Sequence, residues 1–266
     1  MSRIFFKKEG QKPSVFATLG LISAGLAFLA FLAAGPAFRL GIFGDTSTDP
    51  TLFDFQFKLI MVALRLVAVS AGFTLAGIVH GRFSSRARTS WRAFFAAIAI
   101  AAMGWPLGSL FYKAENAPLL HDVSTAPKDH IPFKVLSGRR YDAASPSDIA
   151  GGRLDANYQA RHQQAYPGLG SVPIPGTITE ATRTALNVAE SMGWQIVAQD
   201  TAAGHIEAIY ESPWFGFRSM IVIRVREKDA VAFLDIRSVS EMGHTDFGIN
   251  AKLIGAYTSA LRKRLN

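Results

Sequence analysis

The chain has 266 residues, a formal net charge of +8 and no cysteine. The absence of cysteine excludes disulfide bonds and thiolate chemistry. The charge is unevenly placed, because residues 1–112 hold 11 Lys and Arg against 4 Asp and Glu, whereas residues 113–266 hold 17 against 16. The nearly neutral C-terminal part lacks the basic surface of nucleic-acid-binding proteins, so we expect no nucleic-acid partner.

Three apolar stretches within residues 1–112 predict a transmembrane region of three helices. They cover about residues 14–38, 59–79 and 93–111, and each approaches the roughly 20 apolar residues that cross a bilayer. The first stretch follows a basic segment, as a signal peptide does, but its apolar part exceeds the roughly 15 residues usual for one. We therefore interpret it as a retained membrane anchor.

The loop between the second and third stretches predicts the orientation of the chain. It contains four basic and no acidic residues: Arg82, Arg86, Arg88 and Arg92. Residues 3–12 are also basic, whereas residues 45–58 contain three aspartates and only one basic residue, Lys58. Because basic short loops stay in the cytoplasm, we predict a cytoplasmic N-terminus, and everything after the third span lies outside. In a bacterium this places the protein in the inner membrane and its C-terminal domain in the periplasm.

Arg65 lies within the second predicted span. An ionisable residue inside a membrane is a candidate for function. Arg65 is also near enough to the outer boundary for its side chain to snorkel to the surface, and it could bond a neighbouring helix instead. These interpretations remain open.

The C-terminal part begins with a linker. Residues 113–136 predict this linker and a first short strand at 131–136, and residues 137–176 predict a long loop with a short helix at about 155–164. Residues 177–266 predict the core of the domain. There Thr177 and Glu180 form a capping box, and the helix that they begin ends at Gly193.

Four further strands and a final helix follow. The strands are predicted at 194–199, 205–211, 219–226 and 231–240, and the helix at 248–265. This pattern indicates an α+β fold in which an antiparallel sheet of about four or five strands packs against helices.

Two patches hold the candidate binding residues. The first, which we call the aromatic turn (residues 213–217), contains Trp214, Phe215 and Phe217; it is either buried under the long loop or presented to a membrane or partner. The second patch runs from residue 235 to residue 250 and contributes Asp235, Arg237, Ser238, Ser240, Asp246 and Asn250.

Asp235 and Arg237 lie two residues apart on a predicted strand, so they share a face. They form either a cross-strand ion pair or part of a solvated face, or else an anion site in which a carboxylate orients the arginine. Asp246 comes just before the last helix and is predicted to cap it.

Ser240, His244 and Asp246 have the residue types of a hydrolase triad, but no nucleophile motif accompanies them. The pairs His121 with Asp122 and Asp129 with His130 lack the spacing of a zinc site. We therefore predict no catalytic residue, no metal and no cofactor.

Several segments resemble the family known as domain of unknown function 1499. They are residues 121–125 (HDVST), 214–217 (WFGF), 221–224 (IVIR), 235–240 (DIRSVS) and 243–250 (GHTDFGIN). The resemblance covers about residues 118–265. Two positions depart from the family pattern. Met220 stands where an acidic residue is usual, and His244 stands where a basic or polar residue is usual. The resemblance implies a membrane-associated bacterial protein with relatives in plastids, and supplies no established reaction.

We expect a non-enzymatic inner-membrane protein whose periplasmic domain binds a partner protein or an amphiphile, as an accessory or assembly subunit of a membrane complex. Its expected partners are membrane lipids and a partner membrane protein. The alternative is a membrane-tethered periplasmic enzyme that acts on lipid or cell-envelope material, with Asp235, Arg237, His244 and Asp246 around a pocket. The positions of these four side chains distinguish the two hypotheses.

Overall fold

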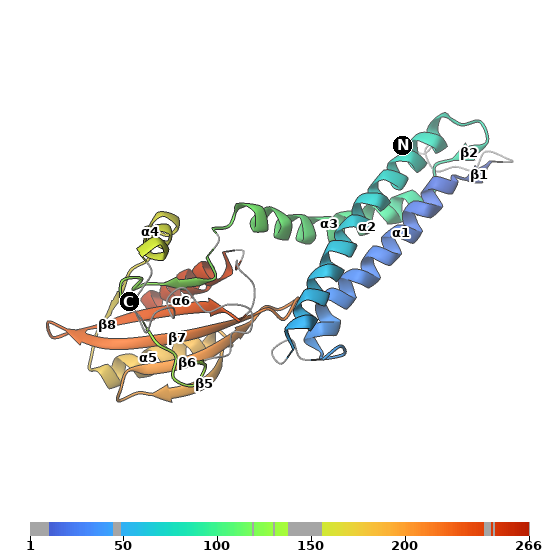
Figure 1. Ribbon diagram of the computed structural model, residues 1–266. Helices are drawn as coiled ribbons and strands as arrows, with labels where there is room; N and C mark the ends of the chain where they lie inside the picture. The colour runs from blue at the N-terminus through green and yellow to red at the C-terminus, as the bar shows by residue number, and fades with distance from the viewer. Residues whose placement is uncertain are drawn as a thin grey trace. The chain divides into compact units, whose positions relative to one another are not determined.

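The computed structural model describes residues 11–44, 49–118, 120–129, 131–137, 156–241, 246 and 248–265 (Figure 1). The chain divides into two compact units, Met1–Tyr112 and Lys113–Asn266. The first contains apolar helices and the second contains an antiparallel sheet with helices. The predicted α+β class is confirmed.

Three long helices make up the first unit: α1 (Val15–Leu32), α2 (Pro50–Phe83) and α3 (Trp91–Asn116). Three helical segments are long and apolar enough to cross a membrane: Val15–Ala37, which continues past the end of α1, Thr51–Phe83 in α2 and Trp91–Tyr112 in α3. The second segment begins earlier than predicted, because Asp49 accepts a 2.8 Å hydrogen bond from the Thr51 N–H. An N-cap aspartate followed by proline is a strong start signal for a helix.

Small residues let α1 and α2 approach closely. A Cβ added at Gly77 would lie 2.6 Å from the nitrogen of Ala17, and one added at Gly20 would lie 2.7 Å from the Thr74 hydroxyl. The Ser70 hydroxyl also donates a 2.8 Å hydrogen bond to the Gly20 carbonyl. In a bilayer, such close backbone packing and interhelical hydrogen bonds hold helices together.

The end of the first span is a π-helical turn, η1 (Ala33–Ala37), which contains Pro36. Proline lacks an N–H and its ring clashes with the carbonyl four residues earlier in an α-helix, and a π turn relieves such a disruption. The side chain of Gln56 donates a 2.8 Å hydrogen bond to the Ala34 carbonyl in this turn. Two short segments, β1 (Lys12–Pro13) and β2 (Ala87–Arg88), pair in parallel.

The sheet of the second unit has six strands in the order β3-β8-β7-β6-β5, with β4 also paired to β8. Their bounds are β3 (Asp122–Ser124), β4 (Val172–Ile174), β5 (Gln195–Asp200), β6 (His205–Glu211), β7 (Arg218–Lys228) and β8 (Val231–Ser240). The four predicted strands of residues 194–240 are confirmed as β5 to β8.

The strands β3 and β4 lie along the same edge of β8. Val123 is opposite Ser238, whereas Pro173 is opposite Phe233, so two segments distant in sequence form consecutive parts of one edge. The sequence pattern predicts neither strand. The predicted strand at residues 131–136 is wrong, because the N–H groups of residues 134–136 bind the Glu207 carboxylate instead of a neighbouring strand.

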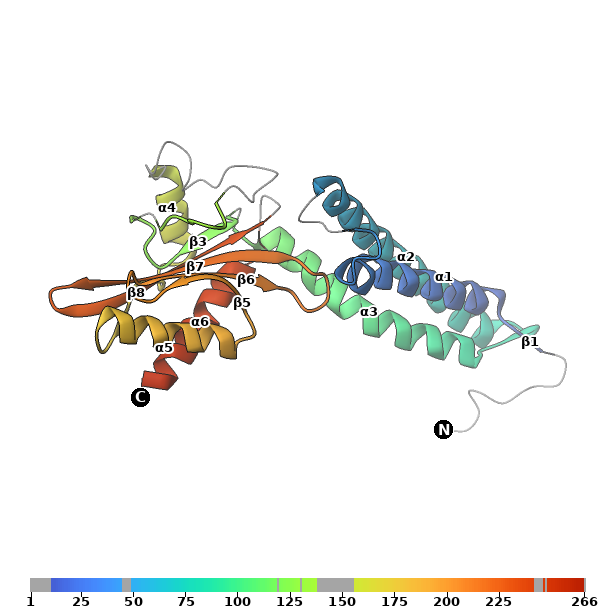
Figure 2. The same ribbon diagram turned by 90° about the horizontal axis from the view of Figure 1, so that it is seen from below.

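Helices α5 (Ile178–Ser191) and α6 (Ile249–Leu265) cover one face of the sheet (Figure 2). Beneath them lies the apolar core, which includes Ala185, Val188, Ile223, Leu234, Ile236, Ile254 and Leu261. Tyr257 of α6 links the layers, because its hydroxyl donates to the Ala185 carbonyl at 2.8 Å and its ring stacks on Trp194 at 5.1 Å. The capping box of Thr177 and Glu180 is confirmed at the start of α5.

The short helix α4 (Ala156–Ala165) covers the outer edge of β3. The Tyr158 hydroxyl donates a 3.0 Å hydrogen bond to the Asp122 carbonyl, and His162 Nε2 accepts a 3.1 Å bond from the Ser124 N–H. Both side chains are buried. They satisfy backbone groups that an uncovered edge strand would offer to another chain.

Candidate functional site

The face of the sheet opposite α5 and α6 is rich in charged residues, and we call it the polar face. Successive residues of a strand point to opposite faces of the sheet. Most apolar residues of the strands face the helices, and the residues between them lie on the polar face. The polar face includes Glu207 of β6, Arg224 and Arg226 of β7, and Asp235 and Arg237 of β8. Asp235 and Arg237 therefore share a face, as predicted.

Arg237 is bound by Asp122 of β3 rather than by Asp235. Its Nε and Nη2 donate to the two carboxylate oxygens of Asp122 at 3.0 and 2.9 Å. Its Nη1 donates to the Ile131 carbonyl at 2.8 Å, and its guanidinium lies 5.1 Å from the centroid of the Phe133 ring. Arg237 is 1% exposed. All three of its nitrogens have acceptors within the protein, so this arginine holds the fold together and does not offer an anion site.

Residues 131–137, which we call the covering segment, lie over part of the polar face. Glu207 of β6 is fully buried and holds this segment against the sheet. Its carboxylate accepts hydrogen bonds from the backbone N–H groups of Lys134, Val135 and Leu136. His205 Nε2 lies 2.8 Å from the same carboxylate. Burial alone would raise the pKa of Glu207, but these hydrogen bonds outweigh it and hold the pKa below its ordinary value.

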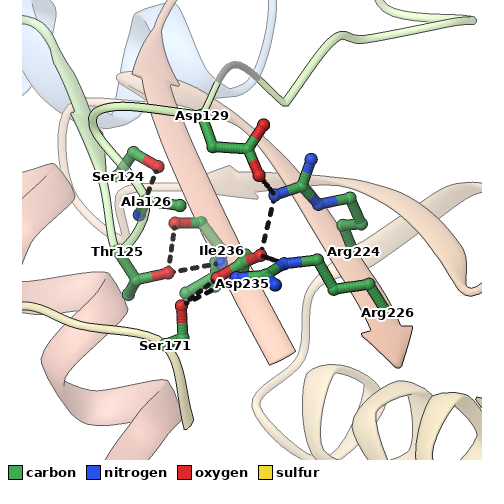
Figure 3. Close-up of polar contacts among 9 residues, drawn as sticks. All are labelled: Ser124, Thr125, Ala126, Asp129, Ser171, Arg224, Arg226, Asp235 and Ile236. Carbon is green, nitrogen blue, oxygen red and sulfur yellow. Dashed lines mark hydrogen bonds and ion pairs between the residues drawn. The ribbon is translucent and has the colours of Figure 1, made fainter. Parts of the chain in front are cut away.

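Asp235 is the centre of a second cluster, which we call the arginine pair site (Figure 3). Arg224 Nη2 and Arg226 Nε donate to its Oδ2 at 2.8 and 2.7 Å, and Ser171 donates to its Oδ1. Burial opposes ionisation of Asp235, but the bonds from Arg226, Ser171 and Arg224 prevail and lower its pKa. Asp235 thus forms a cross-strand ion pair, one of the alternatives left open by the sequence, with arginines of β7 as its partners.

Asp129 binds the outer side of this cluster. Its Oδ2 accepts a 2.6 Å hydrogen bond from Arg224 Nη2. It ends a turn in which the Asp129 N–H donates to the Ala126 carbonyl, with proline at the favoured second position. The turn is held to β8 by Thr125, whose hydroxyl accepts the Ile236 N–H at 2.9 Å (Figure 3).

The remaining polar candidates lie at the start of α6, on the helix side of the sheet. Asp246 accepts N–H bonds from Gly248 and Asn250 at 2.8 and 2.7 Å, which confirms the predicted cap. Ser238 donates to the Asn250 side chain at 2.7 Å, and Asn250 donates to the Ser240 hydroxyl at 3.0 Å. Burial raises the pKa of Asp246 despite the hydrogen bonds that it accepts.

The residues of the enzyme hypothesis do not converge on one pocket among the described residues. Asp235 and Arg237 lie on the polar face and bind separate partners, whereas Asp246 caps α6 on the helix side. His244, His130 and residues 138–155 of the predicted long loop lie outside the described residues. Within the part of the chain that is described, no three His, Asp or Glu side chains are grouped as a metal site would require.

The aromatic turn connects β6 to β7. The Ser212 N–H donates to the Phe217 carbonyl at 2.8 Å, which closes the turn, and Gly216 takes a positive φ of 69°. Phe215 and Phe217 stack with centroids 5.4 Å apart. Trp214 is 38% exposed, which makes it one of the most exposed large apolar side chains of the described sheet domain.

Arg65 is an exposed residue of α2 and points away from the buried interior of the helical unit. Lys58, two turns earlier, is also exposed. An exposed position is compatible with snorkelling to the membrane surface. The alternative functions of Arg65 remain predictions.

Sequence reasoning missed the arginine pair site. The short helix predicted at about 155–164 is confirmed as α4, but its position over β3 was not predicted. Arg224 and Arg226 alternate with apolar residues on a strand, and this pattern predicts a shared face. Asp129 and Ser171 come from segments without periodicity, so no sequence pattern brings them to that face.

The comparisons with known proteins concern the second unit. A search of the curated proteins found no match to this chain. Residues 132–261 match the model of a family described as a protein of unknown function (DUF1499). This match begins after the three apolar helices and after β3, and it covers strands β4 to β8, α4, α5 and most of α6. Residues 132–261 of this chain thus form a domain of the DUF1499 family of proteins of unknown function.

Proposed function

We propose that the protein is a bacterial inner-membrane protein whose periplasmic domain is a binding module for a membrane amphiphile. Its N-terminus is cytoplasmic in this proposal. The amphiphile contacts the domain at the aromatic turn. The expected role as an accessory subunit that serves a partner membrane protein remains a prediction, and the same experiment tests it.

The distribution of charge supports the orientation. The segment between α2 and α3 contains Arg86 and Arg88, whereas Asp45 and Asp49 lie between the first two spans. Short basic loops are retained in the cytoplasm. Three spans then carry the sheet domain to the opposite side, where water and the outer surface of the membrane are its surroundings.

The observation that carries the binding role is the exposure of Trp214 on a turn whose other aromatic rings stack together. Tryptophan is enriched at membrane interfaces, because its ring is apolar and its N–H is polar. The polar candidates Asp235, Arg237 and Asp246, by contrast, are bound to groups of the protein itself.

The domain is also tethered near the bilayer. Residues 113–121 connect the third apolar segment to β3, and a chain of that length spans at most about 30 Å when fully extended. A short tether keeps the local concentration of membrane lipid high for any surface of the domain that reaches it.

The test is purification of the full-length protein from its native membrane in a mild detergent, with mass spectrometry of the bound molecules. We would compare the wild type with Trp214→Ala and with Val231→Ala as the control. Val231 is 43% exposed at the β7–β8 hairpin, so its replacement removes a similar exposed apolar group elsewhere.

We expect a defined lipid at a constant ratio to the protein in the wild type and in Val231→Ala, and its loss in Trp214→Ala. Equal lipid retention by all three proteins would contradict binding at the aromatic turn. A stoichiometric protein partner without a defined lipid would instead favour the accessory-subunit prediction over amphiphile binding.

A further inference from the structure

We propose that Arg224 and Arg226 form a binding site for a phosphate-type oxyanion, and that the Asp129 carboxylate occupies this site until the ligand replaces it. The inference adds an anionic group to the ligand class of the proposed function. Only one part of the inference rests on the proposed function, namely that a membrane lipid is the source of the anion.

The two arginines present donors that the protein leaves unused. Arg224 bonds only through Nη2, and its buried Nε has no hydrogen-bond partner. Arg226 bonds Asp235 through Nε and makes only a long 3.5 Å contact from Nη2 to Ser171. Among the described residues, Nη1 of each guanidinium has no hydrogen-bond acceptor, so the site retains capacity for an oxyanion with several oxygens.

The fold holds both guanidinium groups in place. Asp235 is 0% exposed and binds both arginines from one side, while the guanidinium of Arg226 lies 6.0 Å from the ring centroid of Phe233. The two arginine side chains are 22% and 33% exposed. They are therefore positioned by a buried carboxylate and still reach solvent, as a preorganised anion site requires.

Asp129 is the replaceable partner in this cluster. Its side chain is 57% exposed, and it contacts Arg224 through a single oxygen. An ion pair with an exposed carboxylate contributes little to stability, so an external anion can displace Asp129 at low cost. Once Asp129 moves away, two arginines face one carboxylate and the cluster has a net charge of +1.

A phosphate-type oxyanion fits these donors better than a neutral ligand. Guanidinium groups bind phosphate and carboxylate oxygens through parallel N–H bonds, and the tetrahedral phosphate group can accept from two arginines at once. A lysine replacement would keep the charge but lose this planar fork. The same chemistry is offered by a free phosphate and by the headgroup of an anionic phospholipid.

The experiment titrates the full-length protein, in a neutral detergent, with inorganic phosphate and measures binding by calorimetry. Four variants accompany the wild type: Asp129→Asn, Arg226→Lys, Glu190→Gln and Trp214→Ala. Glu190→Gln is the control for a lost carboxylate, because Glu190 is exposed on α5, on the other side of the sheet.

We expect Asp129→Asn to bind phosphate about two- to fivefold more tightly, since it removes the competing exposed ion pair. Arg226→Lys should bind about tenfold or more weakly, because charged hydrogen bonds of the fork are lost. Glu190→Gln and Trp214→Ala should bind as the wild type does. Phosphate binding in Trp214→Ala would thus persist even if amphiphile binding at the aromatic turn fails.

The source of the anion is distinguished in lipid nanodiscs. If a lipid headgroup supplies it, discs that contain phosphatidylglycerol will weaken phosphate binding relative to discs of phosphatidylcholine alone. If free phosphate is the ligand, the two disc types will give the same affinity. Unchanged affinity in both Asp129→Asn and Arg226→Lys, or no phosphate binding by any variant, would overturn the proposal.

Discussion

Arg237 and Asp122 form a bidentate ion pair between residues that are 115 positions apart in the sequence. Both side chains are almost completely buried. The pair joins β3 to β8 on the polar face and also fixes the covering segment, since Arg237 donates to the Ile131 carbonyl. A single arginine thus connects three parts of the domain.

Replacement of Asp122 by alanine tests the structural role of this pair. The change leaves Arg237 buried without a countercharge, so we expect the free energy of unfolding to fall by about 3–5 kcal/mol. Urea denaturation of the full-length protein in detergent, followed by tryptophan fluorescence, measures it. The matched control is Glu211→Ala, which removes a partly exposed pair with Arg218 at 3.7 Å and should cost less than about 1 kcal/mol. Similar losses in both variants would contradict the prediction.

The stability of the domain should depend on pH through His162. Burial lowers the pKa of His162 below 6.5, although the charge of Asp122 partly opposes this. The unfolded chain therefore binds the proton more readily, and the free energy of unfolding decreases as the pH falls below about 6.5. Protonation also removes the lone pair that accepts the Ser124 N–H.

We expect a slope of at most about 1.4 kcal/mol per pH unit from this histidine between pH 6.5 and 5. The comparison is with His162→Gln, whose amide oxygen can accept the same N–H but does not titrate. Denaturation at several pH values should give a shallower slope for this variant. Parallel curves for the two proteins would exclude His162 as the cause.

The β7–β8 hairpin turn carries backbone strain that glycine would relieve. Asp229 and Ala230 have φ values of 53° and 60°, and the two-residue turn between paired Lys228 and Val231 favours asparagine and glycine. Ala230→Gly should raise the free energy of unfolding by about 1 kcal/mol. Ala202→Gly, in an ordinary exposed turn position, serves as the comparison. A destabilised Ala230→Gly protein would contradict this account of the turn.

The predicted topology can be tested with single cysteines, because the chain has none. Ser85 lies in the segment between α2 and α3, and Ala202 lies in the β5–β6 turn, and both are exposed. We expect a membrane-impermeant maleimide to reach Ala202→Cys from the periplasm and to reach Ser85→Cys only after the inner membrane is permeabilised. The reverse pattern of labelling would show the opposite orientation.

The elements with strong local signals were predictable from the sequence. The helix α5 has a capping box and apolar residues at helical spacing, and β7 and β8 alternate over long stretches. Strands β3 and β4 have three residues each, which is too short for alternation to be recognised. Their pairing depends on β8, more than a hundred residues from β3, so tertiary contacts decide it.

The site was less predictable, because residues that form an ion pair across a fold show no recognisable spacing in the sequence. The shared face of Asp235 and Arg237 follows from their spacing, but Asp235 binds Arg224 and Arg226 while Arg237 binds Asp122. The apolar residues at 131–136 resemble a strand. Their backbone instead binds Glu207, a carboxylate contributed from about 70 residues away.

The end-to-end arrangement of β3 and β4 has a practical consequence for dissecting the protein. The family match starts at residue 132, ten positions after Asp122, which supplies the countercharge of Arg237. A soluble fragment cut at the start of the match would lack the first segment of the sheet edge and expose β8 there. The autonomous folding boundary therefore lies upstream of residue 122, within the stretch that also serves as the membrane tether.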